Sequence, residues 1–389
     1  LQSEALYGTA IVMETATGKI KAIANLGRRP DGHYWEDDNY SLRSTEPGST
    51  IKLATLLSVL EKKTSKIGDP VEVGSTGKAM VGPKMVIDAE RSPKPYLSVA
   101  ECFAHSSNVG MSKLALKAFG KNPSELKEYL QRFHLDTRSP IDLIDVPKPR
   151  MAPLNEKGSA LGNMLWMSFG YALQVSPLHT LTLYNAVANN GVMMKPYLVS
   201  RVQQGGIIYR EFTPTIIDKN ICRPDVIAAA KTSMEMVVTE GTARRAFEGM
   251  PFAVAGKTGT AKKYVGRHVN EKGDTISGGY SNQRYVASFA GFFPADVPKY
   301  SCIVVIHDPN KKKGYYGATV AAPVFKEIAQ KIYTSTPIKD DIVKENFSSE
   351  IIQNLYTSFN KEITENNDII PNVTGMPAMD AISLLENFD

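Results

Sequence analysis

Residues 46–52, with the sequence Glu-Pro-Gly-Ser-Thr-Ile-Lys, constrain the fold more than any other stretch of this chain. Proline followed by glycine is typical of a turn. After it, apolar residues recur at the spacing of one helical face, at Leu53, Leu56, Leu57 and Leu60. We therefore expect Ser49 to open a buried helix, with Lys52 on the same face one turn later. This S-x-x-K pattern is the arrangement of a serine nucleophile with a lysine base.

Two further short motifs support a catalytic interpretation. Ser-Ser-Asn stands at residues 106–108, and Lys-Thr-Gly-Thr stands at residues 257–260. Taken singly, the three motifs are typical of a helix cap, a polar turn and a strand end. Their order, S-x-x-K, then S-x-N, then K-T-G, is that of the penicillin-recognising serine enzymes. The combination favours the enzyme, although no single motif would.

On these motifs the chain resembles the transpeptidase domain of a class B penicillin-binding protein, and among these the division-type enzymes. The resemblance extends to the flanking residues 7–25, 167–178 and 285–294, and covers most of residues 1 to about 335. Two departures are mild. Ala172 stands where the family often has glycine, and Ile51 stands where phenylalanine or methionine is commoner. Neither residue carries an atom that must react.

The resemblance implies an α/β (α+β) fold of the penicillin-binding transpeptidase and serine β-lactamase type. We expect a five-stranded, mainly antiparallel sheet flanked by helices, with a largely helical subdomain. The sequence places the strands at residues 9–14, 19–25, 252–261, 285–293 and 300–307. Residues 68–95 show little periodicity and predict irregular surface structure. Residues 262–284 are polar and glycine-rich, and our hypothesis is a mobile flap over the site.

The expected domain organisation has three parts. Residues 1–335 form the transpeptidase domain, with about 1–60 and 250–335 in the sheet part and about 61–249 in a mostly helical part. Residues 336–366 have the composition of a linker. Residues 367–389 resemble the start of a PASTA module, which is too short to bury a core and is therefore expected to be poorly ordered.

The proposed acylation chemistry involves four residues. Ser49 is the expected nucleophile, and its hydroxyl needs a base within hydrogen-bond reach. Lys52 can act as that base when it is neutral, which burial and the nearby charge of Lys257 would both favour. Ser106 would relay a proton between Lys52 and the departing amine.

The remaining motif residues are expected to bind the substrate. Asn108 would hold a backbone amide of the substrate. Thr258 and Thr260 share one face of a strand, and with the charge of Lys257 they suit a terminal carboxylate. Gly259 would keep the approach of the ligand open. The backbone N–H groups of Ser49 and Thr260 would form the oxyanion hole.

Composition and charge exclude some other classes of protein. The chain carries 45 basic and 40 acidic residues, a net charge of +5 that indicates a mixed solvated surface and argues against a nucleic-acid partner. Its three cysteines form no C-x-x-C pair and its six histidines no H-x-x-x-H pair, which argues against a disulfide framework and a metal site. We expect no cofactor.

The predicted function is that of a peptidoglycan D,D-transpeptidase acting on stem peptides that end in D-Ala-D-Ala. It would have a role in cell wall synthesis and cell division, and β-lactams would acylate the same serine. A serine β-lactamase or D,D-carboxypeptidase is the enzymatic alternative, with Glu156 as a candidate carboxylate for deacylation. A β-lactam sensor or a non-catalytic binding module is the alternative of another class.

The resemblance also implies a location and partners. It places the protein at the extracytoplasmic (periplasmic) face of the bacterial cytoplasmic membrane, with an N-terminal membrane anchor that this chain lacks. No run in the sequence approaches the roughly 18 apolar residues of a membrane span. We expect the chain to be a catalytic piece, and expect a membrane glycan polymerase and divisome proteins to bind through the missing regions.

Overall fold

The computed structural model describes residues 2–335 except 206, 267, 270–274 and 277. The chain divides into two compact units, Leu1–Ile332 and Tyr333–Asp389. Of the second unit, the structure describes residues 333–335, which are the end of helix α10 (Ala322–Ser335). The predicted linker and the PASTA-like segment lie outside the described residues, so both stay predictions.

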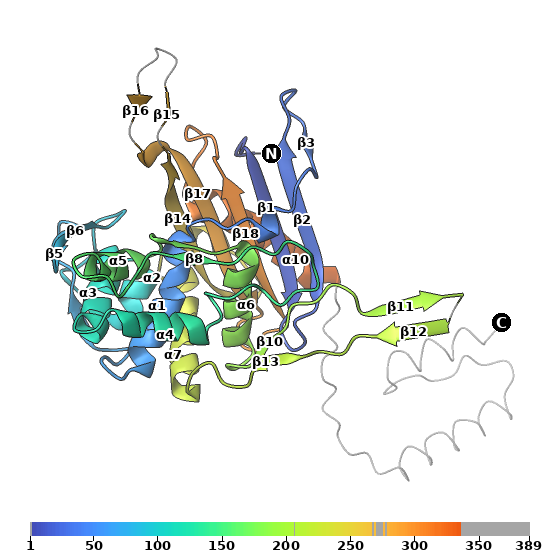
Figure 1. Ribbon diagram of the computed structural model, residues 1–389, viewed down its shortest axis with the longest axis horizontal. Helices are drawn as coiled ribbons and strands as arrows, with labels where there is room; N and C mark the ends of the chain where they lie inside the picture. Colours follow the sequence, from blue (N-terminus) through green and yellow to red (C-terminus); the bar gives the residue numbers. More distant parts are fainter. Residues whose placement is uncertain (1, 206, 267, 270–274, 277, 336–389) are drawn as a thin grey trace, which may run out of the picture. The chain divides into compact units, whose positions relative to one another are not determined.

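A six-stranded antiparallel sheet runs through the first unit (Figure 1). Its order is β14-β17-β18-β1-β2-β3. The strands are β1 (Tyr7–Glu14), β2 (Ile20–Arg28), β3 (Tyr34–Trp35), β14 (Ala255–Val265), β17 (Gly279–Phe293) and β18 (Tyr300–His307). Five of them were predicted. The expectation of five strands missed β3, because a two-residue strand in a polar loop is too short to show an alternating pattern.

The two ends of the first unit meet in the middle of this sheet. β1 pairs with β18 over its whole length, from Tyr7 opposite His307 to Glu14 opposite Tyr300. β1 also pairs with β2 through a hairpin in which Gly18 has a φ of +76°. The first strand therefore joins β2 and β3 to the three strands from the end of the unit.

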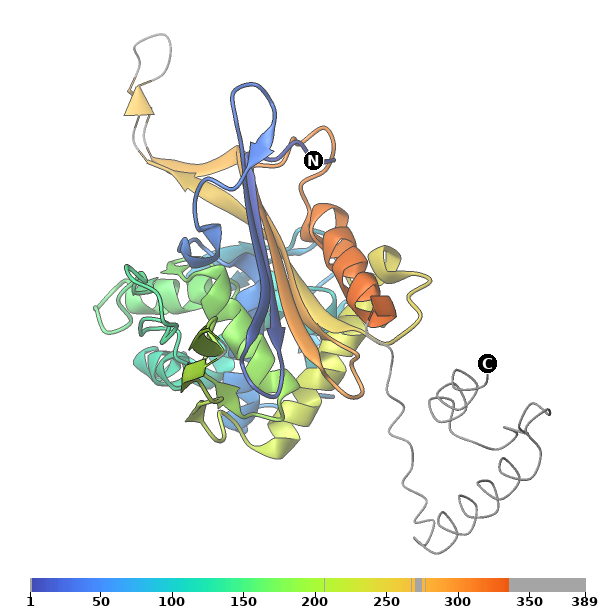
Figure 2. The same cartoon turned by 90° about the vertical axis from the view of Figure 1, so that its right-hand side faces the viewer.

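Helices cover both faces of the sheet (Figure 2). On one face lies α10 (Ala322–Ser335), where the Phe325 ring contacts the Phe289 ring with centroids 4.8 Å apart. On the other face lies α6 (Pro177–Ala188), where Ser301 of β18 donates a hydrogen bond of 2.7 Å to Asn185. Both layers bury aromatic and aliphatic side chains against the strands.

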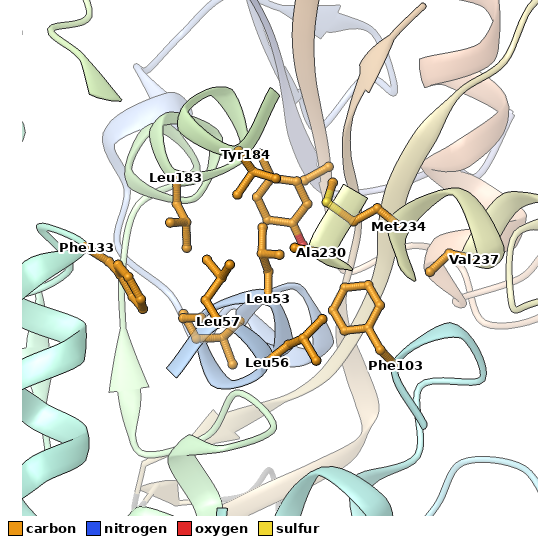
Figure 3. Packing of buried hydrophobic residues seen from close by; sticks show 14 of the residues in the cluster. Leu53, Leu56, Leu57, Phe103, Phe133, Leu183, Tyr184, Ala230, Met234 and Val237 are labelled. Carbon is orange, nitrogen blue, oxygen red and sulfur yellow. The ribbon is translucent and has the colours of Figure 1, made fainter. Parts of the chain in front are cut away.

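Helix α1 (Lys52–Glu61) lies at the centre of the helical part of the unit (Figure 3). Every residue from Lys52 to Leu60 is buried, including the polar residues Lys52, Thr55 and Ser58. Its leucines contact side chains from α2, α6 and α7. The other helices of this part are α2 (Val99–Ala104), α3 (Asn108–Phe119), α4 (Ser124–Arg132), α5 (Ala160–Met167) and α7 (Pro224–Thr239). Two short helices lie elsewhere: α8 (Arg244–Phe247), whose Phe247 contacts Phe289 and Phe325, and α9 (Gly317–Val320), next to β14 and β17.

The prediction of irregular structure at residues 68–95 is wrong. This stretch contains β4 (Pro70–Glu72), which pairs with β7 (Tyr96–Ser98), and a hairpin of β5 (Lys78–Val81) and β6 (Lys84–Ile87). The inward positions Val81 and Val86 are buried. Strands of three or four residues leave too little alternation in the sequence to be recognised.

Smaller two-stranded ladders complete the described part of the chain. They are formed by β8 (Arg150–Met151) with β9 (Leu173–Gln174), β10 (Met193–Met194) with β13 (Ile216–Asp218), β11 (Arg201–Gln204) with β12 (Ile207–Glu211), and β15 (His268–Val269) with β16 (Thr275–Ile276). Within the described residues, no helix has both the length and the apolar character needed to cross a membrane.

The segment predicted as a flap, residues 262–284, is in part a continuation of the sheet. β14 extends to Val265 and β17 begins at Gly279, so the two ends of this segment pair as antiparallel strands. Part of the segment lies outside the described residues. The hypothesis of a mobile flap therefore stays a prediction.

Candidate active site

The expected nucleophile lies in a tight turn immediately before α1. Gly48–Ile51 form a 3₁₀ turn, and the α-helix begins at Lys52. The prediction of a helix that opens at Ser49 is therefore correct, except that its first turn is tighter than an α-helical one. Ser49 is partly exposed, whereas the three residues that follow it are buried. Ser49 therefore keeps some exposure in a turn that is otherwise buried.

The backbone of this turn is fixed from three directions. The Gly48 N–H donates to the carbonyl of Gly170 at 3.2 Å. The buried hydroxyl of Tyr184, from α6, donates to the carbonyl of Thr50 at 2.8 Å. The Thr50 hydroxyl donates to the carbonyl of Pro47 at 2.9 Å. Ser49 is therefore presented by a rigid turn.

The amine of Lys52 is fully buried and reaches the second motif. Its Nζ atom lies 2.6 Å from the carbonyl oxygen of Ser106, 2.7 Å from Oδ1 of Asn108 and 3.2 Å from Oγ of Ser106. Among the described residues, none forms a hydrogen bond with the Ser49 hydroxyl. Catalytic hydrogen bonds often form only when substrate is bound, so this geometry is compatible with a base.

The protonation state of Lys52 is set by its environment. Burial lowers its pKa to about 7, and the opposing effects of Asp88 and Cys102 are smaller. A large fraction of the amine is therefore neutral near pH 7. A neutral amine can donate to the two carbonyl-type oxygens of Ser106 and Asn108 and accept a proton from a hydroxyl with its lone pair.

The S-x-N turn has a strained backbone. Ser106 has a φ of +57°, a conformation that residues other than glycine rarely adopt. Ser107 is the N-cap of α3, and its hydroxyl accepts a hydrogen bond of 2.9 Å from the Gly110 N–H. Asn108 donates through Nδ2 to the carbonyl of Ile87 at 2.7 Å, which turns its Oδ1 towards Lys52. Two functional side chains thus converge on one amine.

Lys257 is the second buried amine of the site. Its Nζ atom lies over the ring of Phe103 and donates to the carbonyl of Thr258 at 3.1 Å. Burial, with the charge of Lys52, lowers the pKa of Lys257 well below its ordinary value. Of the two causes expected to lower the pKa of Lys52, burial does so. The repulsion between the two amines acts instead on Lys257.

The K-T-G segment lies on β14, the edge strand, and packs against the nucleophile turn. A Cβ atom at Gly259 would lie 3.0 Å from Cγ2 of Thr50 and would also meet the Ser288 hydroxyl. We expected this glycine to open the approach of a ligand. The structure gives a different reason, because the close packing of strand and turn leaves no space for a side chain.

The two threonines of this motif have different partners. The Thr258 hydroxyl is buried and lies 2.6 Å from the Thr242 hydroxyl. The Thr260 hydroxyl accepts a hydrogen bond of 3.0 Å from the Gly317 N–H and keeps its own proton for a ligand. Tyr316, just before Gly317, stacks on Tyr315 with ring centroids 4.4 Å apart. An aromatic pair therefore stands beside this part of the strand.

Three groups near the motifs were missed by the sequence analysis. Asp88 accepts hydrogen bonds from the residues that begin α3, and Thr242 pairs with Thr258. Glu46 accepts from the Ala172 N–H at 3.0 Å and from the Tyr280 hydroxyl at 2.7 Å. The turn signal of residues 82–83, Gly-Pro, could have located the hairpin before Asp88. Single threonines and glutamates carry no comparable signal.

Two other residues singled out in the sequence are now placed. Ala172 has a φ of +58°, which explains why glycine is often found at this position in the family it resembles. Glu156, the candidate carboxylate for deacylation, is exposed ahead of α5 and accepts a hydrogen bond of 3.3 Å from Ser159. This environment does not favour a role in activating water.

Comparison with known proteins assigns the chain to a family. Residues 8–330 match the penicillin binding protein transpeptidase domain, and the chain belongs to that family. The peptidoglycan D,D-transpeptidase FtsI of Buchnera aphidicola subsp. Schizaphis graminum is 30% identical over 353 residues, which are 89% of this chain and 56% of that protein. FtsI of Escherichia coli K12 is 26% identical over 362 residues, 90% of this chain and 55% of that protein.

A solved structure shows the same fold. The apo transpeptidase domain of penicillin-binding protein 3 from Burkholderia pseudomallei superposes with a TM-score of 0.70 at 25% identity, over 87% of this chain and 90% of that one. The predicted fold class is therefore confirmed. This chain spans little more than half the length of the two FtsI proteins.

Proposed function

We propose that this chain is the catalytic part of a peptidoglycan D,D-transpeptidase, which cross-links stem peptides ending in D-Ala-D-Ala through an acyl-enzyme on Ser49. The observation that carries the proposal is the buried amine of Lys52. It extends from the helix that follows Ser49, contacts Ser106 and Asn108, and is electrostatically coupled to Lys257. Relatives named peptidoglycan D,D-transpeptidase support it.

In the acylation step, neutral Lys52 takes the proton of the Ser49 hydroxyl while its oxygen attacks the carbonyl carbon of the penultimate D-alanine. The backbone N–H groups of Ser49 and Thr260 stabilise the charge on the carbonyl oxygen. Ser106, with Oγ 3.2 Å from Nζ of Lys52, passes a proton to the departing amine. The C–N bond then breaks, and free D-alanine leaves.

In the second step, an amine of a neighbouring stem peptide attacks the ester of Ser49. The amine loses a proton to the Lys52–Ser106 pair, and the Ser49 oxygen regains one as the ester bond breaks. A β-lactam acylates Ser49 in the same way as the substrate does in the first step. Its ring opens, however, and the leaving amine remains attached to the acyl group. Its acyl-enzyme therefore persists and blocks the site.

The substrate would be oriented by groups on both sides of Ser49. Lys257, Thr258 and Thr260 bind the terminal carboxylate, and the Thr260 hydroxyl has a free proton because it accepts from Gly317. Asn108 uses one N–H of Nδ2 on Ile87, so its second N–H remains for a substrate amide oxygen. The terminal carboxylate and the peptide amide of a D-Ala-D-Ala substrate would therefore be bound by different groups of the site.

The test is intact-mass spectrometry of the protein with a penicillin, followed over hours. We expect a stable adduct on the wild type and on the control Ser124→Ala, in helix α4, and none on Ser49→Ala. No adduct on the wild type would contradict the proposal. Rapid return to the free mass would favour a β-lactamase.

A second measurement separates a transferase from a carboxypeptidase or a sensor. The protein is incubated with a D-Ala-D-Ala peptide and a D-amino acid as acceptor. We expect the product to contain the acceptor, with release of D-alanine. Hydrolysis alone would indicate a carboxypeptidase, and acylation by penicillin without peptide turnover would indicate a sensor.

The location and partners of the whole protein are part of this proposal. The substrate implies action outside the cytoplasmic membrane, where stem peptides are cross-linked. A membrane anchor, a glycan polymerase and divisome proteins remain predictions that concern regions beyond this chain.

A further inference from the structure

Asp88, the residue after β6, binds the start of α3 with both carboxylate oxygens. Oδ2 accepts a hydrogen bond of 2.9 Å from the Ser107 hydroxyl, and Oδ1 accepts one of 2.9 Å from the Val109 N–H. The Asp88 N–H itself donates to the carbonyl of Gly77 at 2.8 Å. The β5–β6 hairpin therefore fixes this carboxylate, and the carboxylate fixes the S-x-N turn.

We propose that Asp88 is a positioning residue for acylation, whose carboxylate holds residues 106–108 in the conformation that directs Ser106 and Asn108 to the amine of Lys52. The inference rests on the proposed function. It concerns a residue outside the three motifs and assigns it a role beyond capping a helix.

The backbone of the turn shows why an external support is needed. Ser106 is held at a φ of +57°, a strained conformation for a residue with a side chain, which persists only where surrounding contacts enforce it. Ser107 and Val109, on either side of Asn108, are the two residues that Asp88 binds. The carbonyl of Ile87, the neighbour of Asp88, binds Nδ2 of Asn108. Two consecutive residues of the hairpin thus fix the turn.

The charge of Asp88 acts on the same amine. The titratable groups that influence Lys52 are Asp88, Cys102 of α2 and Lys257 of β14. Burial raises the pKa of the Cys102 thiol to about 12, so this group is neutral at pH 7. Asp88 is then the anion that favours the protonated amine, and its removal lowers the pKa of Lys52 further.

Two variants separate the geometric effect from the charge. Asp88→Asn removes the charge and weakens the hold on the turn. Ser107→Ala keeps the charge but removes the hydrogen bond to Asp88, together with the N-cap hydrogen bond from the Gly110 N–H. Glu101→Gln is the matched control, because Glu101 is also a carboxylate at a helix start, in the capping box of α2. The measurements are the rate of acylation by a penicillin between pH 5 and 9 and the thermal unfolding midpoint.

We expect both Asp88→Asn and Ser107→Ala to lower the maximal acylation rate by about 10- to 100-fold, since small misplacements of catalytic groups have effects of this size. In Asp88→Asn alone, the acid limb of the pH profile should shift to lower pH by about half a unit or more. Glu101→Gln should keep the wild-type profile even if its unfolding midpoint falls.

Several outcomes would overturn the inference. One is a folded Asp88→Asn with the wild-type rate and pH profile, and another is an equal effect in Glu101→Gln. If Asp88→Asn does not fold, a wild-type rate in Ser107→Ala would overturn it instead. Failure of the wild type to be acylated would contradict the proposed function itself, so the two failures are distinguishable.

Discussion

Gly48 and Gly170 lie backbone against backbone, with the Gly48 N–H donating to the Gly170 carbonyl at 3.2 Å. Both have positive φ values, +56° and +103°. A Cβ atom on Gly170 would run into the main chain of Gly48, which no rotation of a side chain can relieve. The position of Ser49 therefore depends on a residue more than one hundred positions away in the sequence.

Gly170→Ala should displace the nucleophile turn. We expect acylation by a penicillin to fall by about 100-fold or more, together with a lower unfolding midpoint. Gly158→Ala is the matched control, because Gly158 also has a positive φ, +86°, but has open space around it. It should lose about 1–3 kcal/mol of stability through strain and keep its activity. Equal activity of the two variants would contradict the argument.

Lys52→Met should separate activity from stability. The folded-state pKa of Lys52, about 7, lies below the unfolded value of 10.5, so the unfolded state binds more protons between these values. Stability therefore rises with pH from 7 to 10.5. At pH 7 or below, the positive charge on the buried Lys52 destabilises the folded state. Methionine removes that penalty, although it leaves the acceptors Ser106 and Asn108 without a donor.

We expect Lys52→Met to form no penicillin adduct on the timescale of the wild type and to be more stable at pH 7 by about 1–2 kcal/mol. The measurements are intact mass and denaturant unfolding. Lys62→Met is the control, since Lys62 ion-pairs with Glu125 and is not fully buried. It should keep its activity and gain no stability. A less stable Lys52→Met would show that the lost hydrogen bonds outweigh the buried charge.

His307 should make the protein sensitive to acid. Its ring is fully buried and stacks on Tyr7, and within the described residues neither ring nitrogen has a hydrogen-bond partner. Burial, assisted by the charges of Lys263 and Arg43 and opposed by Asp308, lowers its pKa to about 3. The unfolded state therefore binds a proton below pH 6.5 that the folded state does not bind until about pH 3.

Stability should fall as the pH decreases from 6.5 towards 3, by about 2–3 kcal/mol at pH 4.5 from this residue alone. His307→Phe keeps a ring to stack on Tyr7 and should show a smaller loss between pH 7 and 4.5 in denaturant unfolding. His33→Phe, at an exposed position, should keep the wild-type slope. Identical slopes in all three proteins would exclude His307 as the cause.

Thr242→Val should weaken substrate binding at the K-T-G strand. The variant keeps the shape of the side chain but removes the hydroxyl that lies 2.6 Å from the Thr258 hydroxyl. We expect acylation efficiency to fall by about fivefold, mainly through weaker binding of the penicillin before acylation, because one hydrogen bond is worth about 1 kcal/mol. Thr239→Val, which removes an exposed hydroxyl near the end of α7, should have no effect.

The sequence predicts the long elements and the three motifs well, because each has a local signal. The apolar spacing after Lys52 identifies α1, and the Ser-Pro pair at residues 176–177 identifies the start of α6. The isoleucine- and valine-rich run at β18 is predicted with its observed bounds. These elements have enough residues to show a period.

The sequence does not predict what depends on contacts between distant segments. Asp88 lies in a short hairpin whose strands are too brief to show a pattern, and its partners are about twenty residues later. The role of Gly259 in packing could not be recognised before its neighbour Thr50 was known. The source of the low pKa of Lys52 is burial, which only the assembled core defines.

The three cysteines offer a way to follow how this fold opens. Cys102, Cys222 and Cys302 are unpaired and buried, and burial raises the pKa of Cys102 and Cys222 to about 12. In the native state their thiols are therefore both shielded and protonated, and react slowly with alkylating reagents. They lie in α2, just before α7 and in β18. The order in which they become alkylated in mild denaturant would reveal whether the S-x-N region separates from the sheet before global unfolding.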